Sequence, residues 1–156
     1  MNLFKLTCCV CLLGAGLTGK ADNTAGINLY ESEMYSVSKN YFLKQLHAAS
    51  SPEEKAEACY YLGKSYLKLN RPDSAHYYFT QGIETSATYP FNQIGASMLA
   101  LEESSSKGAA DKELQKTIEA SFKDAIKTDK KNIRLPLAVA EAYAYVKDYA
   151  KAEEYI

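Results

Sequence analysis

Two histidines and one cysteine are the residues beyond the N-terminal stretch that could support metal or nucleophilic chemistry. His47 and His76 stand apart, and no further ligands accompany either one at the spacing that a zinc site uses. We expect both to be surface or helix-end residues. Cys59 would need a base that a third group holds in place before it could act as a nucleophile. Its position in the helical pattern described below predicts a buried packing residue instead.

Other polar clusters also lack the arrangement that catalysis or nucleic-acid binding needs. The glutamate pairs at 53–54, 102–103 and 153–154 diverge by about 100° on a helix, so their carboxylates do not face each other. Residues 104–108 lack the leading glycine and preceding strand of a phosphate loop, and we expect a polar connection there. The basic run 127–131 suits a helix C-terminus, and the formal net charge is only −1. The sequence predicts no enzyme activity, no metal, no cofactor and no nucleic-acid partner.

The first 21 residues have the pattern of a secretory signal peptide. Lys5 supplies a positive charge, and residues 6–17 form an apolar run that is too short to span a bilayer as a helix. Gly19 and Ala21 are the small residues of a cleavage site. We expect cleavage before Asp22 and export to the periplasm or the outer cell surface, with membrane contact only through this segment.

Three of the four cysteines, Cys8, Cys9 and Cys11, lie inside the apolar run. Lipidation of one of them is an alternative that stays open, and so is an uncleaved membrane anchor. Cleavage would leave Cys59 as a lone cysteine, which forms no internal disulfide. The exported domain would then depend on packing alone for its stability.

The remaining chain has apolar residues at helical spacing and no stretch that alternates long enough for a strand. Ser51 can cap a helix in which Pro52 occupies the first turn and Glu54 completes a capping box. Pro72, which has no N–H to donate, separates two further helices. The predicted helices are 24–32, 35–48, 52–68, 73–86, 91–103, 111–128, 133–145 and 149 onward.

Two patterns repeat in alternate helices. One places bulky residues at intervals of 37, 43 and 34 residues, namely Phe42, Phe79, Phe122 and Ile156. The other is clearest in Leu62-Gly63-x-x-Tyr66, which is followed by Ala75 nine residues later. A period of roughly 34 residues with insertions is typical of stacked helical hairpins.

These motifs resemble the tetratricopeptide repeat (TPR) family, whose hairpins carry Leu-Gly and Tyr in the first helix and Ala and Phe in the second. The resemblance implies an all-α fold, an α–α superhelix of antiparallel hairpins in which Gly63 lets helices cross closely and Phe79 fills the space between hairpins. Gly82 stands where the family has Ala. The implied units are a degenerate hairpin at 22–55, a repeat at 56–89, a repeat at 90–132 with an insertion near 104–111, and a repeat at 133–156 that is truncated in its second helix.

The first helices of successive TPR hairpins line a concave groove that receives a peptide or a protein. The resemblance implies that the groove residues here are Tyr60, Lys64, Asn92, Ala96, Arg134, Leu137 and Glu141. Aromatic, amide and charged groups of both signs suit hydrogen bonds and ion pairs with a peptide. Contact of the same residues with further hairpins of a longer array stays open.

The sequence therefore predicts a non-catalytic protein–protein interaction scaffold of the cell envelope. The alternative is the exported sensory region of a signal-transduction protein whose membrane span and output domain lie beyond residue 156. Because Ile156 is expected inside the second helix of its hairpin, we expect the sequence to be part of a longer array or protein. An envelope enzyme with an appended repeat region and a glycan-binding surface are further alternatives.

Overall fold

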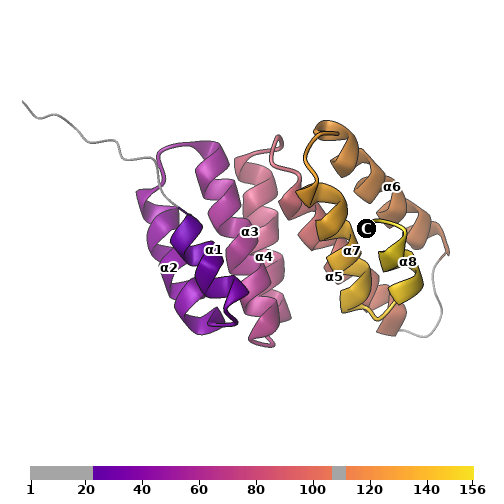
Figure 1. The fold of residues 1–156 in the computed structure, drawn as a ribbon, viewed down its shortest axis with the longest axis horizontal. Helices are drawn as coiled ribbons and strands as arrows, with labels where there is room; N and C mark the ends of the chain where they lie inside the picture. The colour runs from indigo at the N-terminus through magenta and orange to yellow at the C-terminus, as the bar shows by residue number, and fades with distance from the viewer. Residues whose placement is uncertain (1–22, 107–111) are drawn as a thin grey trace, which may run out of the picture.

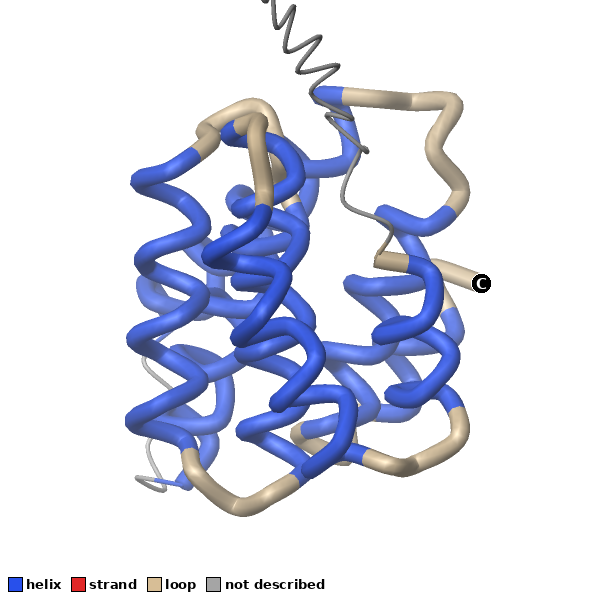
Figure 2. Tube along the Cα trace, turned by 90° about the vertical axis from the view of Figure 1, so that its left-hand side faces the viewer, coloured by secondary structure: helices blue, strands red, loops and turns tan. Residues whose placement is uncertain are grey.

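The computed structural model describes residues 23–106 and 112–156, which form eight helices joined by short connections (Figure 1). These residues contain no strand, as Figure 2 also shows, and the predicted all-α fold is confirmed. None of the described helices is long and apolar enough to cross a membrane. The predicted signal peptide lies outside the described residues. The helices are α1 (Thr24–Glu31), α2 (Tyr35–Ala48), α3 (Pro52–Lys68), α4 (Pro72–Thr85), α5 (Phe91–Ser106), α6 (Lys112–Thr128), α7 (Arg134–Tyr145) and α8 (Tyr149–Glu153).

The helices pair in chain order into four hairpins, and Figure 1 shows the first two side by side at one end of the molecule and the last two together at the other end. Each first helix contacts the first helix of the next hairpin, as in α1–α3, α3–α5 and α5–α7. Each second helix also contacts the first helix that follows it, as in α2–α3, α4–α5 and α6–α7. This repeated packing of a hairpin on its neighbours is the arrangement of a helical solenoid.

Phe79 of α4 is the clearest example of packing between hairpins. Its fully buried ring lies against Gly63 of α3 and Gly95 of α5, and a Cβ on either glycine would lie 2.4 Å from the Phe79 ring. The predicted roles of Gly63 and Phe79 are thus confirmed. Phe42 meets Gly26 in the same way in the first hairpin, where the added Cβ would lie 2.7 Å from the ring.

The turn between the two helices of a hairpin has the same backbone form in each of the three hairpins whose turn the structure describes. Glu33, Asn70 and Lys147 have φ values of 61°, 56° and 64°, which is the left-handed conformation that ends many helices. The N–H after each one donates to the carbonyl five residues earlier, at 2.9 to 3.0 Å: Met34 to Leu29, Arg71 to Tyr66, and Asp148 to Tyr143. The first hairpin therefore repeats the backbone of the others although its sequence motif is weak.

The predicted polar loop at 104–108 is wrong in its first part, because α5 continues through Ser106. Ser104 is buried, and the Ser105 hydroxyl donates to the Leu101 carbonyl at 2.8 Å. This back-bonding satisfies a serine inside a helix. The helix therefore extends into the serine run despite the weak helix propensity of serine. The rest of the predicted insertion lies outside the described residues.

Ile156 also differs from its predicted place inside the second helix of the last hairpin. Helix α8 ends at Glu153, and Ile156 is 90% exposed. The final N–H groups bond to carbonyls three residues back, at Lys151, Ala152 and Glu153. Bonds of this type tighten the last turn of a helix, so Ile156 does not continue the buried face that Ala152 begins.

Candidate functional site: the inner groove

Two adjoining hollows lie on the face formed by the first helices of the hairpins, and we call them together the inner groove. The larger hollow has a volume of about 490 Å³ and is lined from all four hairpins. The smaller hollow has a volume of about 130 Å³. Residues that line both are Tyr30, Glu31, Lys64 and Glu141. The two hollows therefore meet at these four side chains.

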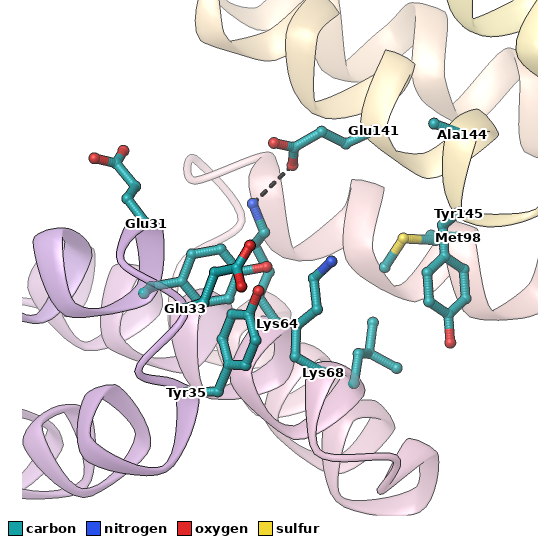
Figure 3. Close-up of a pocket in the computed structure, with 11 residues that line it drawn as sticks. Glu31, Glu33, Tyr35, Lys64, Lys68, Met98, Glu141, Ala144 and Tyr145 are labelled. Carbon is teal, nitrogen blue, oxygen red and sulfur yellow. Dashed lines mark hydrogen bonds and ion pairs between the residues drawn. The ribbon is translucent and has the colours of Figure 1, made fainter.

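An ion pair crosses the groove at the point where the hollows meet. Lys64 Nζ of α3 lies 2.7 Å from Glu141 Oε2 of α7, and Figure 3 shows the two side chains reaching toward each other. Helix α5 lies between these helices in the packing order. Ala96 of α5 follows Gly95 as Lys64 follows Gly63, so it occupies the equivalent place on the middle helix. Alanine has only a methyl group at this place, whereas the equivalent positions of the two flanking hairpins carry the charged pair.

Lys64 is held more firmly than its partner. Its ammonium lies 4.7 Å from the centre of the Tyr30 ring and 5.5 Å from that of Tyr60, which are cation–π distances. The Lys64 side chain is 16% exposed, whereas that of Glu141 is 51% exposed. The groove thus contains a fixed cation and an anion that reaches it from solvent.

The smaller hollow has a second cation, Arg134, at the start of α7. Its Nη2 donates to the Tyr61 hydroxyl at 2.6 Å, and its guanidinium lies 5.4 Å from the centre of the Phe91 ring. Burial raises the pKa of Tyr61 to about 12, although the positive charge of Arg134 opposes this shift. The phenol therefore stays neutral at neutral pH, and Arg134 keeps its full charge next to it.

The structure brings four of the seven predicted groove residues together on the groove surface. Lys64, Arg134, Leu137 and Glu141 line the smaller hollow, and Leu137 is 52% exposed. Tyr60 is buried and contributes a wall of that hollow rather than an exposed ring. Ala96 is half-buried between the helices that the ion pair joins. Binding of a partner by these residues stays a prediction.

The prediction that Asn92 faces the groove is wrong. Its side chain is fully buried, and its Nδ2 donates to the Ala56 carbonyl of α3 at 2.8 Å. Gly82 of α4 makes room for it, because a Cβ at Gly82 would lie 2.2 Å from Asn92 Cγ. Glycine at position 82, where the TPR family has alanine, therefore leaves the space in which the Asn92 side chain is buried.

Sequence reasoning missed the groove residues that come from the first hairpin and from the ends of the first helices. These include Tyr30, Tyr35, Lys68, Met98 and Tyr145 (Figure 3). Lys68 could have been found, because it lies one helical turn after Lys64 and so on the same face. Tyr30 of α1 and Tyr35 of α2 were missed because the first hairpin matches the TPR motif only weakly, and the resemblance implied groove residues in the other three hairpins.

The residues first considered for chemistry lie elsewhere. His47 and His76 are exposed, as predicted. Cys59 is buried, which confirms its predicted packing role, and burial raises the pKa of its thiol to about 11. Within 23–106 and 112–156, no three His, Cys, Asp or Glu side chains gather as a group that could hold a metal ion.

Comparison with known proteins agrees with the hairpin architecture. A tetratricopeptide repeat family model matches residues 56–88, which include all but the first turn of α3 and the whole of α4. No curated protein matches the sequence. Among solved structures the chain is similar to YrrB, described as a TPR protein with an unusual peptide-binding site, with 21% identity and a TM-score of 0.46. That match covers 86% of this chain, which spans 66% of the length of the YrrB chain. The predicted resemblance is confirmed: the protein is TPR-like, and the residues that the structure describes are helices and their connections.

Proposed function

We propose that the protein is a non-catalytic interaction scaffold whose inner groove receives a peptide or an extended segment of a partner protein. The observation that carries this proposal is the larger hollow, to which all four hairpins contribute side chains. Its lining combines aromatic and apolar groups with charges, a composition that suits recognition of a peptide. Tyr145 in the larger hollow and Leu137 in the adjoining smaller hollow leave apolar surface exposed, so a bound segment would have area to bury.

Selection of peptides on the purified chain tests this proposal. Peptides enriched from a random displayed library should bind the wild-type protein and should bind Leu137→Ser about tenfold more weakly, because burial of the leucine side chain is lost. Ile133→Ser is the matched control, since Ile133 is 83% exposed and lines neither hollow. Failure to enrich any peptide, or equal binding by Leu137→Ser and wild type, would contradict the proposal.

We further propose that the scaffold works outside the cytoplasm, in the periplasm or on the outer cell surface. The support is the N-terminal pattern of Lys5, the apolar run at 6–17 and the small residues before Asp22. Cell fractionation followed by mass spectrometry of the N-terminal peptide tests it. The expected protein begins at Asp22 and lies outside the inner membrane, and a cytoplasmic protein that retains Met1 would contradict export.

A further inference from the structure

The ion pair in the middle of the groove is asymmetric, because only one of its members is free to leave. The Lys64 ammonium lies between the Tyr30 and Tyr60 rings, and its side chain is mostly buried. The Glu141 side chain is half exposed, so its carboxylate can rotate into water, and the mostly buried Lys64 ammonium then needs another anion as its partner. An external carboxylate could therefore take the place of Glu141 on a cation that is already fixed.

The position of the pair places that exchange on the path of a bound segment. Lys64 and Glu141 line both hollows. A segment that occupies both hollows must pass over the ion pair, and Figure 3 shows Glu141 extending from α7 over Lys64. The Glu141 carboxylate thus occupies the place where a group of the partner would meet the ammonium.

Two further cations flank the pair without a carboxylate of their own. Lys68 lines the larger hollow, and Arg134 lines the smaller one. In the part of the chain that the structure describes, no carboxylate oxygen lies within 4.0 Å of either side chain. Lys68 instead faces the Tyr35 ring at 5.9 Å, and Arg134 donates to the neutral Tyr61 phenol. Lys68 and Arg134 therefore both have N–H groups that can donate hydrogen bonds to an acceptor on a bound segment.

The other charged residues that line the groove are two glutamates of the first hairpin. Glu31 and Glu33, at the end of α1 and in the turn after it, line the larger hollow, and Glu31 also lines the smaller one. Like charges repel, so these two glutamates disfavour an acidic segment close to α1. They favour a position nearer Lys64, Lys68 and Arg134.

We propose that the groove binds an acidic segment of its partner, and that Glu141 is an internal stand-in for an Asp or Glu side chain that the partner places on Lys64. This inference rests on the proposed function of the groove. In the free protein Glu141 neutralises Lys64, and on binding it turns into solvent as the partner's carboxylate replaces it. Removal of the Glu141 charge therefore strengthens binding, although Glu141 is itself a groove residue.

Fluorescence anisotropy with short labelled peptides of defined charge tests the inference. The probe is a peptide in which Glu alternates with Leu, with both ends blocked so that no terminal carboxylate is present, and the Gln-for-Glu peptide is its neutral counterpart. Glu141→Gln should bind the Glu probe about three- to fivefold more tightly than wild type. This factor corresponds to the free energy that a partly exposed ion pair contributes. Lys64→Met should bind it more weakly, and neither change should alter the affinity for the Gln probe by a similar factor.

Glu84→Gln is the matched control, because Glu84 is an exposed carboxylate of α4 outside both hollows. It removes the same charge and should leave the affinity for the Glu probe unchanged. Equal or weaker binding of the Glu probe by Glu141→Gln overturns the inference even if Lys64→Met unfolds. If selected peptides bind and depend on Leu137 while the Glu probe does not bind, the acidic partner is wrong and the groove function stands. If neither binds, both proposals fall.

Discussion

Asn92 and Gly82 determine each other's environment at the scale of single residues. The buried Asn92 amide links α5 to the Ala56 carbonyl of α3, and the missing Cβ of Gly82 leaves the space it needs. A buried polar group is stable only while it keeps its hydrogen-bond partner. Displacement of the amide would therefore lose the link between two hairpins as well as packing volume.

Gly82→Ala should lower the free energy of unfolding by about 2 kcal/mol, because the added methyl group displaces a buried hydrogen-bonded amide. The double variant Gly82→Ala with Asn92→Ala should lose less than the sum of the two single variants, since the clash disappears with the amide. Urea denaturation followed by circular dichroism measures all three. Glu84→Ala, on the exposed side of α4, should have little effect, and strict additivity of the two single changes would contradict the contact.

At the scale of elements, the ends of the helices show which boundaries the sequence could predict. The predicted capping box is present, with Glu54 N–H donating to Ser51 Oγ at 3.1 Å, and α3 begins at Pro52. A capping box involves only residues that are close together in the chain, so a helix start that depends on one can be predicted from the sequence. The end of α5 was missed because a run of serines is typical of a loop and does not indicate that the Ser105 hydroxyl bonds back to the Leu101 carbonyl inside a helix.

Lys147 offers a test of the repeated hairpin turn. Its φ of 64° is unfavourable for a residue with a Cβ, whereas glycine adopts it without strain. Lys147→Gly should therefore raise the free energy of unfolding by about 0.5 to 1 kcal/mol. Lys151→Gly, inside α8, is the control, and thermal denaturation should show that it destabilises the protein. A lower melting temperature for Lys147→Gly would mean that the turn does not have this conformation.

At the scale of the whole molecule, the tyrosines connect the hairpins from within. Tyr30 of α1 meets Tyr61 of α3 with ring centres 5.9 Å apart, and Tyr60 meets Phe91 of α5 at 5.3 Å. The resemblance predicted the stacking order and four of the groove residues. It could not predict the contacts of Lys64 with Glu141 or of Arg134 with Tyr61, because these depend on the curvature that brings α7 toward α3.

Alkaline pH should destabilise the protein through these buried phenols. Burial raises the pKa of Tyr61 to about 12 and also raises those of Tyr30, Tyr60 and Tyr143 above their ordinary value of 10.0. The unfolded chain releases these protons near pH 10 while the folded chain keeps them. The stabilisation is therefore complete below pH 10 and is lost as pH rises through the folded pKa values.

Melting temperatures recorded across this alkaline range should fall steeply, and part of the tyrosinate absorbance, that of the buried phenols, should rise only as the protein unfolds. Tyr143→Phe should make the fall less steep, because one buried phenol no longer titrates. Tyr77→Phe, at an exposed position, should leave the slope unchanged. A melting temperature that is constant through this range would show that the buried tyrosines ionise equally in both states.

The ion pair over Ala96 also bears on how the array unfolds. In a repeat array whose units contact only their neighbours, the free energy of unfolding is the sum of one contribution from each unit and one from each interface between neighbouring units. The contacts of Lys64 with Glu141 and of Tyr61 with Arg134 join the second hairpin to the fourth over the third. They add a second-neighbour coupling, so fraying of the last hairpin would weaken the second one directly. A ligand that replaced Glu141 would remove part of that coupling and make the two ends of the array more independent in their unfolding.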